Sequence, residues 1–197
     1  MRLGELCQLS SGFTARGRLE PAQSDGLLAI QLRDVQGDDD VGSEDLHRYL
    51  LGDIPDHYLV HGGEVIFRSR GKPNTATVVG ASLGEPAVVI LPLIIIRPIR
   101  EVLLPEYLAW AINQPDAQRR LDAVAQGTSL RMISKAVLER INVPLPDLAT
   151  QSRIVAIHAL AKQESSLLRE LAGRRERLTS LVLTERAKHA DQEGFPQ

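Results

Sequence analysis

Hydrophobic positions in the first hundred residues alternate with polar ones or form short apolar runs, which is the pattern of strands. Residues 27–35 pass from an apolar run to an alternation that places Gln31 and Arg33 on one side of a strand. Residues 65–71 are expected to form a strand that ends at a glycine. The apolar run 87–96, which Pro92 interrupts, predicts one or two buried strands. Further strands are expected within residues 3–9 and 75–80.

The hydrophobic period changes to that of helices after residue 100. Three helices are expected, over Pro105–Asn113, over residues 115–127 and over residues 135–140, the last with Ser134 as its cap. Prolines 144 and 146 exclude a helix from the segment that follows. The prediction is therefore an α+β fold, a domain of mixed strands and helices.

The end of the chain carries one long helical pattern. It starts with Thr150 as the expected cap and runs to about Lys188, which is roughly 60 Å at about 1.5 Å per residue. A domain of this size cannot cover such a helix, so we expect its apolar stripe to pack on another surface as a coiled coil. The alternative is an amphipathic tail folded along its own domain. The positions expected at a dimer or partner contact are Ile154, Ile157, Ala161, Leu168, Leu171, Leu178, Leu181 and Val182.

Length and composition agree with this division. A chain of 197 residues with 43% hydrophobic residues can bury one core and still carry an extension. We expect a globular domain over residues 1–149, a spacer or dimerisation helix over 150–190 and a disordered tail over 191–197. Cys7 is the single cysteine, and no segment resembles a signal peptide or a membrane span, so we expect a cytoplasmic protein that does not enter a membrane.

The formal net charge of −2 argues mildly against a nucleic-acid ligand, because cationic side chains on phosphates supply most of such affinity. The charges are distributed unevenly, however, and local charge matters more than the total. Acidic residues gather at 38–40, whereas Arg68, Arg70 and Lys72 stand close together in the sequence. Each of these clusters has a simpler interpretation as a solvated face.

The sequence shows no catalytic motif. It lacks the Pro-Pro-Tyr or Pro-Pro-Phe signature of amino-methyltransferases, a glycine-rich nucleotide loop and a nuclease carboxylate-lysine set. His57 and His61 share helical spacing, but two glycines adjoin them and no third ligand is evident. We therefore expect no metal site, no cofactor in this chain and no enzymatic activity of its own.

Several short segments form a recognisable series along the chain. The central one reads Gly63-Glu64-Val65-Ile66-Phe67-Arg68-Ser69-Arg70-Gly71, and a second one closes the domain with Val143-Pro144-Leu145-Pro146-Asp147-Leu148-Ala149-Thr150-Gln151. The others are residues 3–6 with 11–12, 30–35, 105–108, and 127–129 with 133–134. In their order and spacing, these segments resemble the DNA specificity (S) subunits of type I restriction-modification systems, and the resemblance covers nearly the whole chain.

The resemblance implies that residues 1–149 are a target recognition domain and that the long helix is a spacer. The usual subunit carries two such domains and two helices, whereas this chain carries one of each, so it resembles half a subunit. A homodimer reading a bipartite inverted repeat in double-stranded DNA is then expected. The resemblance also implies partners that perform the chemistry, which are an adenine methyltransferase (modification) subunit using S-adenosylmethionine and a restriction or translocase subunit.

Reading DNA requires donors and acceptors on loops, together with Arg and Lys on phosphates. The candidate DNA-binding residues are Arg16, Arg18, Gln31, Arg33, Arg68, Arg70, Lys72, Asn74, Thr128, Ser129, Arg131 and Lys135. Each has an alternative role: Arg33 can pair with Asp34, Thr128 and Ser129 can act as caps, and Arg131 can be solvated. Two other classes of function stay open, an autonomous DNA-binding or regulatory protein and a dimerising module without methyltransferase partners.

Overall fold

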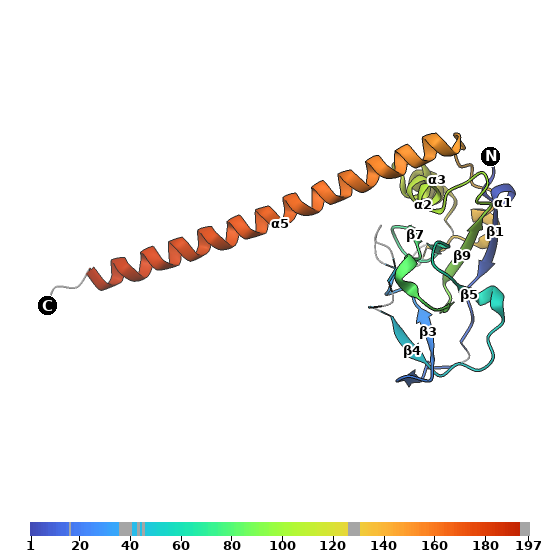
Figure 1. Cartoon of the computed structure of the whole chain (residues 1–197), viewed down its shortest axis with the longest axis horizontal. Coiled ribbons are helices and arrows are strands. Elements are labelled where there is room, and N and C mark those ends of the chain that lie inside the picture. Colours follow the sequence, from blue (N-terminus) through green and yellow to red (C-terminus); the bar gives the residue numbers. More distant parts are fainter. Residues whose placement is uncertain (16, 36–40, 43, 45, 126–130, 194–197) are drawn as a thin grey trace. The chain divides into compact units, whose positions relative to one another are not determined.

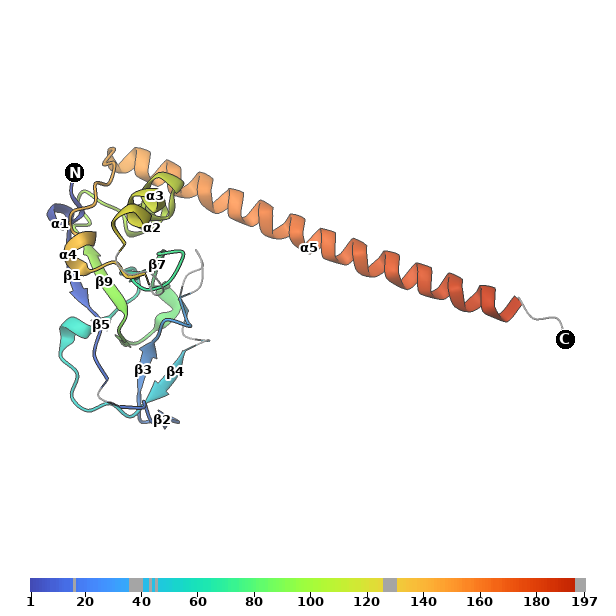
Figure 2. The same cartoon turned by 180° about the vertical axis from the view of Figure 1, so that it is seen from behind.

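A computed structural model describes the chain except for residues 16, 36–40, 43, 45, 126–130 and 194–197, and the side chains of residues 190–193. It divides into two compact units, Met1–Val155 and Ala156–Gln197. The elements are labelled in Figures 1 and 2. The helices are α1 (Leu3–Leu6), α2 (Pro105–Asn113), α3 (Pro115–Val124), α4 (Lys135–Leu138) and α5 (Leu148–Glu193). The strands are β1 (Cys7–Ser11), β2 (Pro21–Ala22), β3 (Leu27–Ile30), β4 (His47–Tyr49), β5 (Leu59–Val60), β6 (Val65–Arg68), β7 (Ala76–Val78), β8 (Ala87–Val89) and β9 (Leu93–Pro98).

The strands of the first unit form two sheets. One has the order β1-β9-β6-β7 and is antiparallel throughout. The other has the order β2-β4-β3-β8-β5, with β3 and β8 running parallel. Both views show β3 and β4 at one end of this unit and α2 and α3 at the other (Figures 1 and 2).

The apolar run 87–96 forms two buried strands, as its pattern predicts. β8 ends before Pro92 and β9 begins after it. Along β9 the pleat directs Ile94 and Ile96 into the core that contains α2, whereas Leu93 and Ile95 enter a second core with β3 and β8. Because β9 is buried on both faces, its sequence is a continuous apolar run rather than an alternation.

The helices of the first unit follow their local signals. α2 has the predicted bounds, with Pro105 at its first turn. α3 begins at Pro115 as predicted but ends at Val124, before the expected Gly127. Ser134 caps α4, since its hydroxyl accepts a hydrogen bond from the Val137 N–H.

Two expectations in the strand-rich half were correct only in part. The strand expected within residues 3–9 begins at Cys7 as β1. Residues 3–6 form a helical turn instead, because Leu3 and Leu6 are both buried at helical spacing and the Arg2 N–H donates to the Glu5 carboxylate. The strand expected over 27–35 ends at Ile30. There Asp34 accepts from the Gln31 N–H at 2.8 Å and folds the following residues into a turn.

The long C-terminal helix is present as α5, and its 46 residues correspond to roughly 69 Å. Thr150 is not its cap. The helix begins at Leu148, and the Asp147 carboxylate accepts from the Thr150 N–H at 2.7 Å, so Asp147 holds the capping position. The helix also continues through residues 191–193, which were expected in the tail, because no proline interrupts it and no glycine occurs between Gly173 and Gly194.

The first two turns of α5 are anchored in the first unit by Gln151, which is fully buried. Its side-chain oxygen accepts from the Leu104 N–H at 2.9 Å, and its amide nitrogen donates to the carbonyls of Val102 and Pro146, both at 2.8 Å. Ile154 packs against the same core. Gln151 thus joins the start of α5 to the start of α2.

Candidate nucleic-acid interface

The turn that follows β6 lies against the segment that leads into α4. The Gly71 N–H donates to the Arg131 carbonyl at 3.1 Å, and the Ile133 N–H donates to the Ser69 carbonyl at 2.8 Å. Arg70 and Met132 form an antiparallel bridge between these contacts. Gly71 adopts φ +94, a conformation that favours glycine. Three predicted DNA-binding residues, Arg70, Lys72 and Arg131, are therefore brought together from segments about 60 residues apart.

A carboxylate from α3 joins two of these cations. Asp122 accepts from the Lys72 ammonium at 2.7 Å through one oxygen and from the Arg131 guanidinium at 3.2 Å through the other. Arg131 also donates to the Asp122 backbone carbonyl at 2.9 Å. The hydrogen bond from Lys72, and then the charges of Lys72 and Arg131, lower the pKa of Asp122. We name Arg70, Lys72, Asp122 and Arg131 the basic clasp.

The cations of the basic clasp remain accessible. The Lys72 side chain is 64% exposed and that of Arg131 is 38% exposed, and Arg70 is also exposed. A phosphate approaching this surface can therefore contact them. No local pattern in the sequence pointed to Asp122. Its two partners lie 50 residues before it and nine residues after it, and both contacts follow from the packing of α3.

Arg68 and Asn74 hold the turn of the clasp in place. Arg68 donates to the carbonyl of Val35 at 3.2 Å and to that of Arg70 at 3.3 Å. Asn74 is buried, and its amide donates to the Arg68 carbonyl at 3.0 Å. The carbonyl of Asn74 in turn accepts from Gln118 of α3 at 2.9 Å. Both predicted residues are thus engaged with the protein itself.

Gln31 and Arg33 lie in the turn after β3. Arg33 donates to the Tyr49 hydroxyl at 2.7 Å and pairs with Asp34 at 3.4 Å, which is the alternative role considered for it. Its side chain is nevertheless 55% exposed. The buried amide nitrogen of Gln31 has no hydrogen-bond partner among the residues that the structure describes.

The remaining candidates contact other parts of the first unit. Arg18 is exposed in the loop before β2, and the Lys135 ammonium donates to the Leu9 carbonyl at 3.3 Å and pairs with Glu139 at 3.3 Å. Arg16, Thr128 and Ser129 lie outside the described residues. The DNA-binding role of every candidate remains a prediction.

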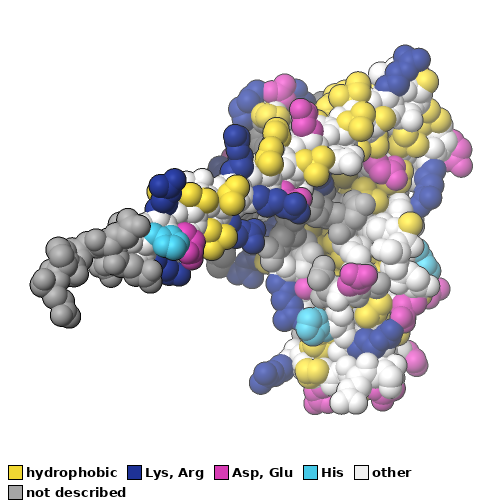
Figure 3. All heavy atoms as spheres, turned by 60° about the vertical axis from the view of Figure 1, so that its left-hand side comes forward, with side chains coloured by type: hydrophobic (Ala, Val, Ile, Leu, Met, Phe, Trp, Pro, Cys, Tyr) yellow, Lys and Arg dark blue, Asp and Glu magenta, His cyan; other side chains and the backbone are white. Residues whose placement is uncertain are grey.

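Most of the predicted helix contacts are uncovered on the single chain. Ile154 packs against the core, whereas Ala161 is exposed and the other predicted positions are more than half exposed, namely Ile157, Leu168, Leu171, Leu178, Leu181 and Val182. Figure 3 shows hydrophobic side chains interspersed with Lys and Arg along this helix. Exposed apolar side chains in this number are typical of a surface that another protein covers.

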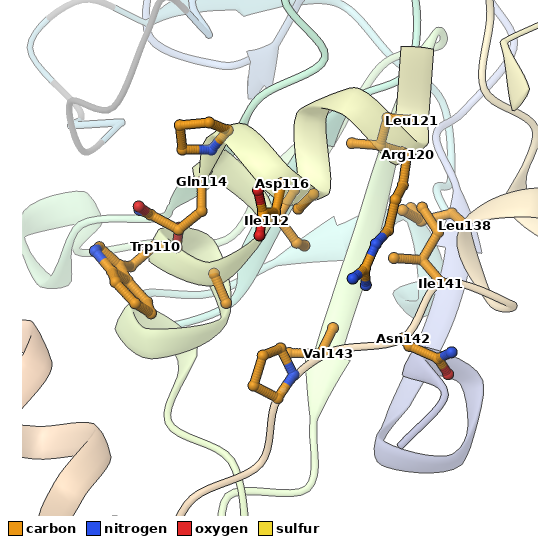
Figure 4. Close-up of a pocket in the computed structure, with 14 residues that line it drawn as sticks. Trp110, Ile112, Gln114, Asp116, Arg120, Leu121, Leu138, Ile141, Asn142 and Val143 are labelled. Carbon is orange, nitrogen blue, oxygen red and sulfur yellow. The ribbon is translucent and has the colours of Figure 1, made fainter. Parts of the chain in front are cut away.

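A separate cavity of about 420 Å³ lies between α2, α3 and the segment that follows α4 (Figure 4). Apolar side chains such as Ile112, Leu121 and Val143 line it, with Trp110 at one side and Arg120 extending from α3 toward it. None of the predicted site residues is in its lining.

Within the described part of the chain, no three His, Cys, Asp or Glu side chains are grouped as metal ligands. No helix over those same residues has the length and apolarity that a membrane span requires.

Comparison with known proteins gives similarity in structure alone. No protein-family model and no curated protein matches the chain. Among solved structures, a chain from a study of complex assembly and conformational transition in a type I restriction-modification system matches with TM-score 0.68 and 22% identity, over 91% of this chain and 42% of that one. The HsdS subunit from Thermoanaerobacter tengcongensis matches with TM-score 0.64 and 21% identity, over 86% of this chain and 38% of that one.

The S subunit of the type I restriction-modification system from M. genitalium matches with TM-score 0.56 and 12% identity, over 95% of this chain and 42% of that one. This chain therefore spans about two fifths of the length of the proteins it resembles. The agreement extends over nearly all of this chain, so the resemblance seen in the sequence motifs is present in the fold. The chain has the fold of the specificity subunits of type I restriction-modification systems.

Proposed function

We propose that this chain is a DNA sequence-recognition subunit of a type I restriction-modification system and that its first unit reads one half of a bipartite target. The observation that carries the proposal is the shared fold, which covers 86–95% of this chain but only 38–42% of the proteins it resembles. One mixed α/β domain and one long helix are what half of a two-domain, two-helix subunit would contain.

The basic clasp is the surface that supports DNA contact. Lys72 is exposed and Arg131 is partly exposed, both contact Asp122, and Arg70 is exposed on the same turn as Lys72. Each phosphate that such a cation neutralises contributes about −0.9 to the slope of log affinity against log salt. With the formal net charge at −2, we expect weak binding by the isolated chain and tighter binding in a complex with its partners.

Pairing of α5 with a second copy supplies the other half of the reader. The exposed apolar side chains from Ile157 to Val182 lose contact with water in such a pair, which stabilises it by about 25 cal/mol for each Å² buried. A two-fold axis through an antiparallel pair relates the two recognition units, so the target is an inverted repeat with a gap of fixed length.

The chemistry belongs to partner subunits in this proposal. An adenine methyltransferase subunit binds S-adenosylmethionine and modifies the target, and a restriction or translocase subunit completes the system. This chain contributes recognition and no catalytic group.

The test is co-expression with a type I modification subunit, followed by methylation-sensitive sequencing of the cellular DNA. The expected result is adenine methylation at an inverted repeat with a fixed central gap. Lys72→Ala with Arg131→Ala should reduce that methylation, whereas Arg119→Ala, which removes an exposed arginine on α3, should leave it unchanged. If the two chains neither associate nor methylate DNA, the proposal is refuted. An autonomous DNA-binding protein or a dimerising module is then the better interpretation.

A further inference from the structure

Asp122 is an unexpected residue at a surface that is proposed to contact phosphates. Its carboxylate neutralises part of the charge of Lys72 and Arg131 and repels the DNA backbone. On electrostatic grounds alone its removal would strengthen DNA binding. Its presence at the centre of the basic clasp therefore points to a role other than affinity.

The geometry of the contact supplies such a role. The backbone bonds between Ser69–Gly71 and Arg131–Ile133 fix where the two cationic side chains start, but not where their long stems end. Asp122 determines their ends, because each of its oxygens binds a different cation and its carbonyl binds Arg131 a second time. These contacts restrict the rotamers that the two cationic side chains adopt.

We propose that Asp122 is a positioning residue that sets the sequence preference of the interface. It holds Lys72 and Arg131 in one arrangement, so the domain meets the duplex in one register, and it weakens binding to DNA in general. Phosphate contacts fix the register from which base edges are read, so the position of these cations affects specificity as well as affinity. This inference rests on the proposed DNA-recognition function.

A neighbouring ion pair on the same helix serves as the comparison. Asp116 and Arg119 are three residues apart on α3, and both side chains are 73% exposed. Asp116 pairs with this arginine of its own helix, whereas Asp122 joins α3 to two other segments. Asp116→Asn therefore makes the same change in charge on α3 without disturbing the clasp.

The experiment is selection from a random pool of duplex DNA by the full chain in complex with the modification subunit, followed by sequencing of the bound fraction. We expect the unchanged chain to enrich one motif. The enrichment of that motif by Asp122→Asn should be at least tenfold lower. The same variant should bind random DNA more tightly, by up to roughly tenfold at about 0.1 M salt, because the basic clasp gains one net positive charge. Asp116→Asn should behave like the unchanged chain.

Asp122→Glu separates charge from position. It keeps the carboxylate on a longer stem, so its affinity for random DNA should stay within about twofold of the original, while the enrichment of the motif falls. The inference would be overturned by two results together. Asp122→Asn would increase the affinity for the motif and for random DNA by the same factor, and Asp122→Glu would enrich the motif as fully as the unchanged chain. Asp122 would then only neutralise charge. Absence of any enriched motif with the unchanged chain would instead refute the proposed function.

Discussion

Replacing Gln151 with Leu should destabilise the first unit substantially although the two side chains have similar volumes. Gln151 is fully buried and makes three hydrogen bonds to backbone groups of Val102, Leu104 and Pro146. A leucine fills the space but leaves one N–H and two carbonyls without their partner. At roughly 1 kcal/mol net for each bond, the loss is about 3 kcal/mol of the free energy of unfolding.

Urea unfolding followed by Trp110 fluorescence measures this loss. The chain has one tryptophan, and it lies on α2, the helix that Gln151 joins to α5. With a urea dependence of about 2 kcal/mol per M, the expected decrease in the unfolding midpoint is about 1.5 M.

Gln163→Leu is the matched control, because it makes the same exchange at an exposed position of α5. Its midpoint should stay close to that of the unchanged chain. Midpoints for the two variants that agree within about 0.3 M would refute the reasoning, since the three hydrogen bonds would then contribute no measurable stability.

Three other predictions concern a thiol, a helix cap and the exposed helix. Burial raises the pKa of the Cys7 thiol to about 12. Its reaction with a disulfide reagent at pH 8 should therefore be at least about a hundredfold slower in the folded chain than in urea, and equal rates would contradict this. The hydrogen bond from the Thr150 N–H lowers the pKa of Asp147, so its contribution to stability is complete above the pKa of the unfolded state and is lost as pH falls through the lower folded value. Asp147→Asn keeps the cap but removes this titration, and the decrease in Tm from pH 7 to pH 2 should become shallower, whereas an unchanged slope would argue against it. Leu171→Glu with Leu178→Glu places charges on the exposed stripe and should convert a dimer into a monomer in light scattering, and a dimer that persists would exclude α5 pairing through these positions.

Where the signal was local, the sequence predicted the structure. Pro105 and the helical spacing that follows it defined α2, and Ser134 identified the start of α4. The interrupted run 87–96 predicted two buried strands, and the apolar pattern after residue 150 predicted the long helix. Each of these features depends on residues within a few positions of one another, where propensity, capping and hydrophobic period act directly.

The long-range contacts, both in the candidate site and at the start of α5, depended on tertiary structure. Asp122 meets Lys72 across 50 residues of sequence, and Gln151 meets Leu104 across 47, so neither contact leaves a local pattern. Gln31 and Arg33 alternated like strand residues, yet the Asp34 carboxylate folded them into a turn. The sequence therefore determined which elements form and which residues carry charge. Only the packing of α3 against the turn after β6 decided which of those charges act together, because long-range neighbours are set by the fold as a whole.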